Sequence, residues 1–113
     1  FEINALGESE LFDGLPPSFT TFMSHFDEVR PCEGMTVIAQ TDRCGVAGYR
    51  VDGCRMWGIQ FHPEMDKTEA EELTVVRING RPDLGFDLEA SLAASVDSTQ
   101  LAQTLMANMF AVP

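Results

Sequence analysis

The spacing of hydrophobic residues changes near residue 64, a little past the middle of the chain. Before that point, aromatic and β-branched residues form short runs, which are typical of strands. After it, apolar residues recur at i and i+4 behind helix-capping residues, which is typical of helices. The pattern predicts strands within residues 1–61 and mainly helix over residues 66–111. The expected strands cover residues 1–6, 19–23, 35–40, 46–51 and 55–61.

Turn-forming residues separate these strands. Ser9 is expected to cap a single helical turn through Phe12, and Gly14 to end that turn. Asp52-Gly53 stands between two apolar runs. Both residues tolerate positive φ, so the dipeptide predicts a β-hairpin.

Three capped segments make up the predicted helical half. Residues 68–71 fit a capping box, and the helix that they begin is expected to reach about Asn79 and stop at Gly80. A short second helix is expected from Asp87. Ser98 is the expected N-cap of a last helix, which places Leu101, Leu105 and Met109 on one face with Ala102, Met106 and Phe110 beside them.

The candidate chemistry lies where the apolar run of residues 57–61 meets His62, Pro63 and Glu64. A continuous apolar run predicts a buried inner strand, which Pro63 ends because proline has no N–H for the sheet. Ligands gather at such strand ends in α/β proteins. Residues 62 and 64 of an extended chain point to one side, so Glu64 can bond to one ring nitrogen of His62 and leave the other free as a base. An ordinary strand end with a solvated carboxylate fits the same residues.

Two segments resemble motifs of the class I glutamine amidotransferases. Residues 58–64 read G-I-Q-F-H-P-E, and residues 22–29 contain M-S-H-F-D-E-V, similar to the family's M-S-H-x-D-x-V. The resemblance implies an α/β fold: the C-terminal half of a flavodoxin-like amidotransferase domain, with a mixed sheet followed by helices. Residues 1–64 would supply strands and active-site loops, and residues 65–113 a helical tail. The length of this tail is similar to that of free-standing family members.

The resemblance also implies roles for individual residues. The family opens the side-chain amide of glutamine by acyl transfer through a Cys-His-Glu triad. His62 would be the base and Glu64 the residue that orients it. Ser24, His25 and Phe26 would border the glutamine pocket. An ordinary turn, in which Ser and Asp side chains bond to nearby backbone N–H groups, is the alternative for that loop.

The nucleophile of the triad is not evident in this sequence. The family's Gly-x-Cys-x-Gly elbow sits between a strand and a helix, whereas Cys44 precedes a predicted strand, Cys54 closes the predicted hairpin and Cys32 follows a proline. We therefore expect an N-terminal half of the domain, from the same gene or another chain, to bring the cysteine. This chain alone is expected to be inactive. It opens at Phe1 rather than Met, which indicates a processed, trimmed or partial chain.

The composition and net charge of the chain limit the kinds of partner that it is expected to bind. The 113 residues are 44% hydrophobic, enough for one small domain, and carry 18 acidic against 7 basic residues, a net charge of −11. Such a surface repels phosphate backbones and anionic lipid, so we expect no nucleic-acid and no membrane partner. No signal peptide is visible, and three cysteines without a C-x-x-C pair argue against a disulfide framework or zinc ribbon. We expect a cytoplasmic protein without metal or cofactor.

Three functions are compatible with these features. The first is a glutamine amidotransferase that releases ammonia from glutamine. The second is a γ-glutamyl peptidase or hydrolase with the same triad, because both reactions open a γ-glutamyl acyl bond. The third is a catalytically inactive domain that acts as a binding module. An ammonia-accepting partner would favour the first, cleavage of γ-glutamyl peptides the second, and a substituted cysteine upstream the third.

Overall fold

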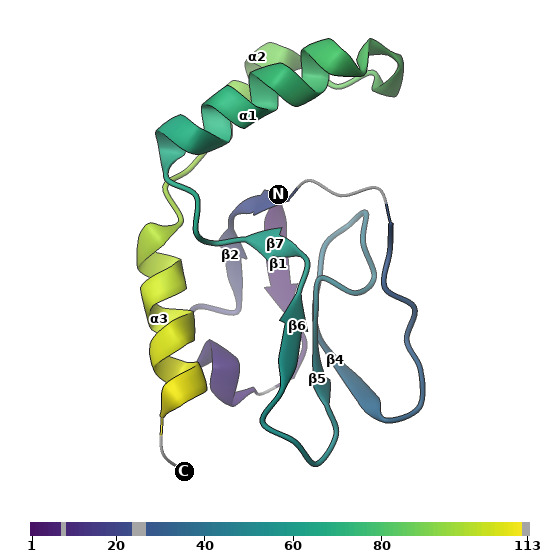
Figure 1. Cartoon of the computed structure of the whole chain (residues 1–113), viewed down its shortest axis with the longest axis vertical. Helices are drawn as coiled ribbons and strands as arrows, with labels where there is room; N and C mark the ends of the chain where they lie inside the picture. The colour runs from purple at the N-terminus through teal and green to yellow at the C-terminus, as the bar shows by residue number, and fades with distance from the viewer. Residues whose placement is uncertain (8, 24–26, 112–113) are drawn as a thin grey trace.

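The structure, a computed structural model, describes residues 1–7, 9–23 and 27–111 and places strands before helices (Figure 1). The strands are β1 (Glu2–Ala5), β2 (Ser18–Thr20), β3 (Phe22–Met23), β4 (Met35–Gln40), β5 (Gly48–Val51), β6 (Trp57–Ile59) and β7 (Phe61–His62). The helices are α1 (Lys67–Gly80), α2 (Leu88–Ala93) and α3 (Thr99–Phe110), with the short 3-10 turns η1 (Glu10–Phe12) and η2 (Pro82–Leu84). The predicted α/β order is confirmed.

The strands form two small sheets. The larger has the order β2-β1-β4-β5-β6, and the smaller pairs β3 with β7. Among the strands that the structure describes, every pair is antiparallel. In Figure 1 the sheets lie at the centre, α3 runs along one side next to η1, and α1 with α2 crosses above them.

Two of the predicted strands are each divided in two. Thr21 separates β2 from β3, and Gln60 separates β6 from β7. The two later pieces leave the large sheet and pair with each other, so that Phe22 lies opposite His62. The prediction of one uninterrupted inner strand through His62 is therefore wrong. The apolar run does not predict this division, because the pairing of strands depends on residues that are distant in the sequence.

The last strand of the large sheet is also less buried than its sequence suggests. Within the described chain β6 lies at the edge of that sheet, and Ile59 is 38% exposed. Its partner β5 joins it through the predicted hairpin, with Gly53 in the turn at φ +75°. The turn is longer than the Asp-Gly pair, because Val51 N–H donates to the Met56 carbonyl at 2.9 Å.

The hydrophobic core fills the space between the sheets, η1 and α3. Phe19 contacts the rings of Phe12 and Phe61 edge-on, with centroids 5.7 Å apart in both pairs. Leu105 of α3 is 3% exposed and belongs to this core. Asn108, one turn later, donates to the backbone carbonyls of η1 and the turn after it, Leu11 at 2.8 Å and Asp13 at 2.9 Å. The last helix is thus part of the core, not an appendage.

Local hydrogen bonds set the helix starts, and one start differs from the prediction. Asp66 caps α1 by accepting from Glu69 N–H at 2.8 Å, while Glu69 accepts from Asp66 N–H at 3.4 Å. The capping box predicted at residues 68–71 is wrong because this pair forms the same box two residues earlier. The short second helix begins directly after Asp87, close to its predicted start, and Asp87 caps it by accepting from Ala90 N–H at 3.1 Å.

The cap of α3 also differs. Ser98 occupies the N-cap position as predicted, but its hydroxyl makes no capping hydrogen bond. Asp97 accepts from Thr99 N–H at 2.9 Å in its place. The Ser98 hydroxyl is instead buried against another part of the chain.

Helices α1 and α2 extend from the rest of the molecule as an arm (Figure 1). Only Ala70 and Thr74 of α1 are buried, no residue of α2 is, and Val76 is 66% exposed. None of the helices in the described chain is both long and apolar enough to cross a bilayer.

Candidate functional site

The candidate site is the pair of side chains at the end of β7. His62 ends the strand, and Glu64 follows it past Pro63. Glu64 Oε1 lies 2.8 Å from His62 Nδ1, so the predicted contact is confirmed. An ionised carboxylate only accepts hydrogen bonds, so Nδ1 carries the proton in this contact. The Nε2 of a neutral ring is then unprotonated and available as a base.

The surroundings leave this pair accessible. The His62 side chain is 40% exposed and that of Glu64 62%. The ring of Phe22, on the paired strand β3, lies beside the imidazole, with centroids 6.0 Å apart and planes tilted by 58°. One flank of the imidazole is therefore covered by an aromatic ring, while the pair still meets solvent. A reacting group can approach it there.

The residues predicted to bind substrate follow strand β3 in the sequence. Ser24, His25 and Phe26 lie outside the described residues. Strand β3 ends at Met23, directly before them, and it pairs with the strand that carries His62.

The cysteines occupy loop positions. Cys44 lies between β4 and β5, is 5% exposed and donates from Sγ to the Val46 carbonyl at 3.3 Å. Cys32 and Cys54 are exposed, and Cys54 lies in the turn between β5 and β6. Each is followed by a turn or strand rather than a helix, so none of them has the setting of a nucleophile elbow. Among the residues that the structure describes, no three His, Cys, Asp or Glu side chains gather in a way that could hold a metal ion.

A groove of about 910 Å³ lies between the arm and the strands. Much of its lining is apolar and comes from both sides, including Phe1, Phe22, Met23, Val76, Phe86 and Ala90. At the arm, the Arg43 guanidinium lies 5.3 Å from the centroid of the Phe86 ring. The groove is therefore a largely hydrophobic surface next to the strand that flanks His62.

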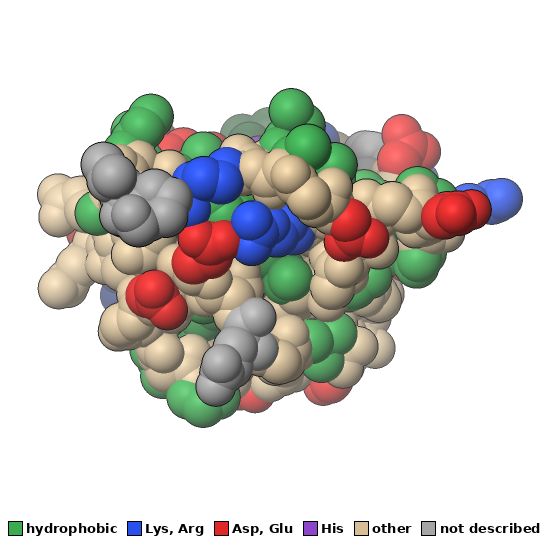
Figure 2. Space-filling model, turned by 90° about the horizontal axis from the view of Figure 1, so that it is seen from below, with side chains coloured by type: hydrophobic (Ala, Val, Ile, Leu, Met, Phe, Trp, Pro, Cys, Tyr) green, Lys and Arg blue, Asp and Glu red, His purple; other side chains and the backbone are tan. Residues whose placement is uncertain are grey.

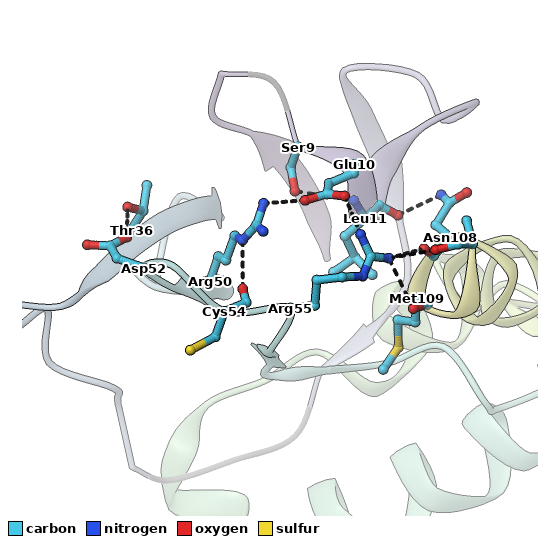
Figure 3. Close-up of polar contacts among 11 residues, drawn as sticks. Ser9, Glu10, Leu11, Thr36, Arg50, Asp52, Cys54, Arg55, Asn108 and Met109 are labelled. Atoms are coloured by element: carbon cyan, nitrogen blue, oxygen red, sulfur yellow. Dashed lines mark hydrogen bonds and ion pairs between the residues drawn. The ribbon is translucent and has the colours of Figure 1, made fainter. Parts of the chain in front are cut away.

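The opposite end of the molecule carries a cluster that sequence analysis missed (Figure 3). Glu10 accepts from both Arg50 and Arg55, the latter at 2.5 Å. Both guanidiniums lie over the ring of Trp57, 5.5 and 5.2 Å from its centroid. Arg55 Nη2 also donates at 3.2 Å to three carbonyls at the C-terminal end of α3, those of Asn108, Met109 and Ala111. The cluster joins η1, the hairpin and α3.

Electrostatics supports a structural role for this cluster. Burial alone would raise the pKa of the Glu10 carboxyl, but hydrogen bonds from Arg55 and Arg50 and their positive charges outweigh burial and lower that pKa below its usual value. Figure 2 shows the molecule from this end, where basic, acidic and apolar side chains are interspersed. The arginines are paired with protein groups, so the cluster stabilises the fold and is separate from the His62 site.

Known proteins with similar sequences include glutamine-hydrolyzing enzymes. The family model described as glutamine amidotransferase class-I matches residues 2–77. One subunit of the glutamine-hydrolyzing GMP synthase from Methanococcus maripaludis strain C6 is 37% identical over 83 residues, which is 73% of this chain and 43% of that relative. A glutamine-hydrolyzing GMP synthase from Clostridium novyi is 40% identical over 68 residues, which is 59% of this chain and 13% of that relative.

Solved structures share the fold. A glutamine amidotransferase from Thermotoga maritima aligns with a TM-score of 0.75 over 96% of this chain and 48% of its own, at 16% identity. A protein described as a GMP synthase subunit, from Thermoplasma acidophilum, aligns with a TM-score of 0.53 over 57% of this chain and 33% of its own, at 28% identity. The chain thus spans less than half the length of the relatives it matches.

Proposed function

Because the chain belongs to the class I glutamine amidotransferase family, we propose that it is part of a glutaminase, which hydrolyses the side-chain amide of glutamine and releases ammonia. The observation that carries the proposal is the 2.8 Å contact between His62 Nδ1 and Glu64 Oε1 at a strand end. Acyl transfer from an amide needs a base held in one orientation next to the nucleophile. His62 is the base, and Glu64 orients it.

The proposed reaction has two steps. Nε2 of His62 takes the proton of a cysteine thiol, and the thiolate attacks the side-chain carbonyl carbon of glutamine. The protonated imidazole, stabilised by the Glu64 carboxylate, gives its proton to the leaving nitrogen, so the C–N bond breaks and ammonia departs. Water, deprotonated by His62, then hydrolyses the thioester to glutamate and restores the thiol.

We further propose that a preceding half of the domain brings the thiol. Two features of this chain support it: its share of the relatives' length, 43% and 48%, and the apolar groove between arm and strands, which that half would cover. Burying the apolar lining of this groove would favour association. Ser24, His25 and Phe26 are the proposed contacts to the substrate. The glutamine-hydrolyzing relatives favour glutamine over a γ-glutamyl peptide as that substrate.

The test is a glutaminase assay on the full-length protein. We expect His62→Ala and Glu64→Gln each to lower kcat by about 10²–10⁴-fold, because the first removes the base and the second removes the carboxylate that orients it. Glu72→Gln removes an exposed carboxylate on α1 and serves as the control, with unchanged turnover expected. A His62→Ala enzyme that turns over like the parent would refute the assignment, and cleavage of γ-glutamyl peptides but not glutamine would favour the alternative substrate.

A second assay tests where the nucleophile resides. Purified residues 1–113 alone should neither hydrolyse glutamine nor be labelled by a glutamine-analogue electrophile that alkylates the catalytic cysteine. Without a thiolate beside it, His62 can activate only water, a poorer attacker of an amide. Specific labelling of Cys32, Cys44 or Cys54 would place the nucleophile within this chain and overturn that part of the proposal.

A further inference from the structure

Two buried hydroxyls lie behind the strand end that carries His62. Thr21 and Ser98 are each 2% exposed, and their Oγ atoms are 3.0 Å apart although 77 positions separate them in sequence. Thr21 Oγ1 also lies 3.4 Å from the carbonyl oxygen of His62. A carbonyl only accepts, so Thr21 donates to it and the remaining proton of the pair, that of Ser98, points to Thr21 Oγ1. The result is a chain of hydrogen bonds from Ser98 through Thr21 to His62.

Ser98 makes a second contact with the same segment. Its backbone N–H donates to the Met65 carbonyl at 3.0 Å. Residues 62–65, which contain both members of the His62–Glu64 pair, are thus held at their first residue by Thr21 and at their last by Ser98. The site side chains are 40% and 62% exposed, and their described contacts are with the Phe22 ring and with each other, so their placement depends largely on this backbone.

The Ser98 hydroxyl is used in an unusual way. At the N-cap of a helix it would ordinarily accept from a free N–H of the first turn. Here Asp97 fills that role, and Ser98 contacts Thr21. Buried hydroxyls destabilise a fold unless they are paired, and a pair that is satisfied in only one arrangement specifies that arrangement. Apolar residues of similar size would fill the same space without this restriction.

We propose that Thr21 and Ser98 are positioning residues of the site, which hold residues 62–65 so that the His62–Glu64 pair meets its nucleophile at one distance. The inference rests on the proposed function. It extends the site beyond residues 2–77, the part that the family model matches, because Ser98 belongs to the start of α3. A misplacement of about 1 Å can lower a rate about 10²-fold, so a modest loosening of this segment is measurable.

The activity test uses full-length enzyme. Thr21→Val keeps the volume and removes the hydroxyl, and we expect kcat to fall about tenfold or more while KM changes less than about twofold. Thr21→Ser keeps the hydroxyl and should restore most of the activity. Ser98→Ala should resemble Thr21→Val, and the double variant should be no worse than either, because the two hydroxyls act as a unit. The control is Ile38→Val, a core change away from this link that should lower the Tm but not kcat.

Hydrogen exchange gives a readout that does not depend on turnover. In Thr21→Val the amides of Phe61, His62, Glu64, Met65 and Ser98 should exchange at least about tenfold faster, with β4 and β5 unchanged. Ile38→Val should show no such selective change. If the parent enzyme hydrolyses no glutamine, the proposed function fails while this measurement still decides the link. Parent-like exchange at Ser98 in Thr21→Val, or parent-like kcat in both Thr21→Val and Ser98→Ala, would overturn the inference.

Discussion

Gly58 lies where the fold leaves no room for a side chain, and replacing it tests the packing of the strand that leads to His62. It pairs with Tyr49 across β5 and β6. A Cβ atom at Gly58 would lie 2.4 Å from Cε1 and Cζ of the Tyr49 ring and 2.6 Å from its hydroxyl oxygen. Non-bonded carbon atoms prefer about 3.5–4.0 Å, so Gly58→Ala must displace the ring or the strand.

The cost can be bounded from two opposing terms. Overpacking costs about 1–3 kcal/mol. Gly58 is not among the glycines with positive φ, so alanine adopts its backbone conformation without strain and gains about 0.4–1 kcal/mol from reduced freedom of the unfolded chain. The half-buried Tyr49 ring can turn partly aside, which places the expected net loss near the lower half of the range, about 1–2 kcal/mol.

Urea unfolding followed by the fluorescence of Trp57, the sole tryptophan of the chain and the neighbour of Gly58, measures this loss directly. Gly45→Ala is the matched control, because its Cβ would meet nothing within 4 Å, and it should be neutral or slightly stabilising. Combining Gly58→Ala with Tyr49→Ala removes the obstructing ring, so the two changes should be strongly non-additive. If Gly58→Ala unfolds at the same urea concentration as Gly45→Ala, the steric argument is wrong.

Two further predictions concern stability. The lowered pKa of Glu10 means that its contribution to stability is fully present above the ordinary glutamate pKa and is lost as the pH falls through the lower pKa of the folded state. The Tm of Glu10→Gln should therefore fall less steeply than that of the parent as the pH becomes acidic. Parallel curves of Tm against pH would contradict the assigned cause. Asp66→Ala removes the observed cap of α1 and should cost about 1 kcal/mol in urea unfolding, whereas Thr68→Ala, at the cap predicted from sequence, should cost clearly less.

The parts of the fold that the sequence predicts are those decided by near neighbours. The contact between His62 and Glu64 follows from their i, i+2 spacing beside a proline, and the hairpin from Asp52-Gly53. Even the misplaced cap of α1 is a local error, since Asp66 and Thr68 compete for one helix start.

What the sequence does not predict depends on distant partners. Nothing near Thr21 or Gln60 indicates that the chain changes sheets there, because the change is completed only by the pairing of β3 with β7. Ser98 matches an N-cap pattern, yet its hydroxyl bonds to a residue 77 positions away. The local sequence pattern indicates which hydrogen bonds a residue can form, and the tertiary fold determines which of them it forms.

The contacts of Asn108 bear on the order in which this protein can be built. Its amide binds backbone 95 and 97 positions earlier, and Leu105 beside it completes the core. During synthesis the strands therefore emerge before the helix that covers them, and their apolar side chains lack that partner until α3 has been made. This core cannot be completed before α3 is present, and the packing of α3 against η1 is a long-range contact of the kind that slows folding. We therefore expect the strands to expose apolar surface in the interval before residues 105–110 leave the ribosome.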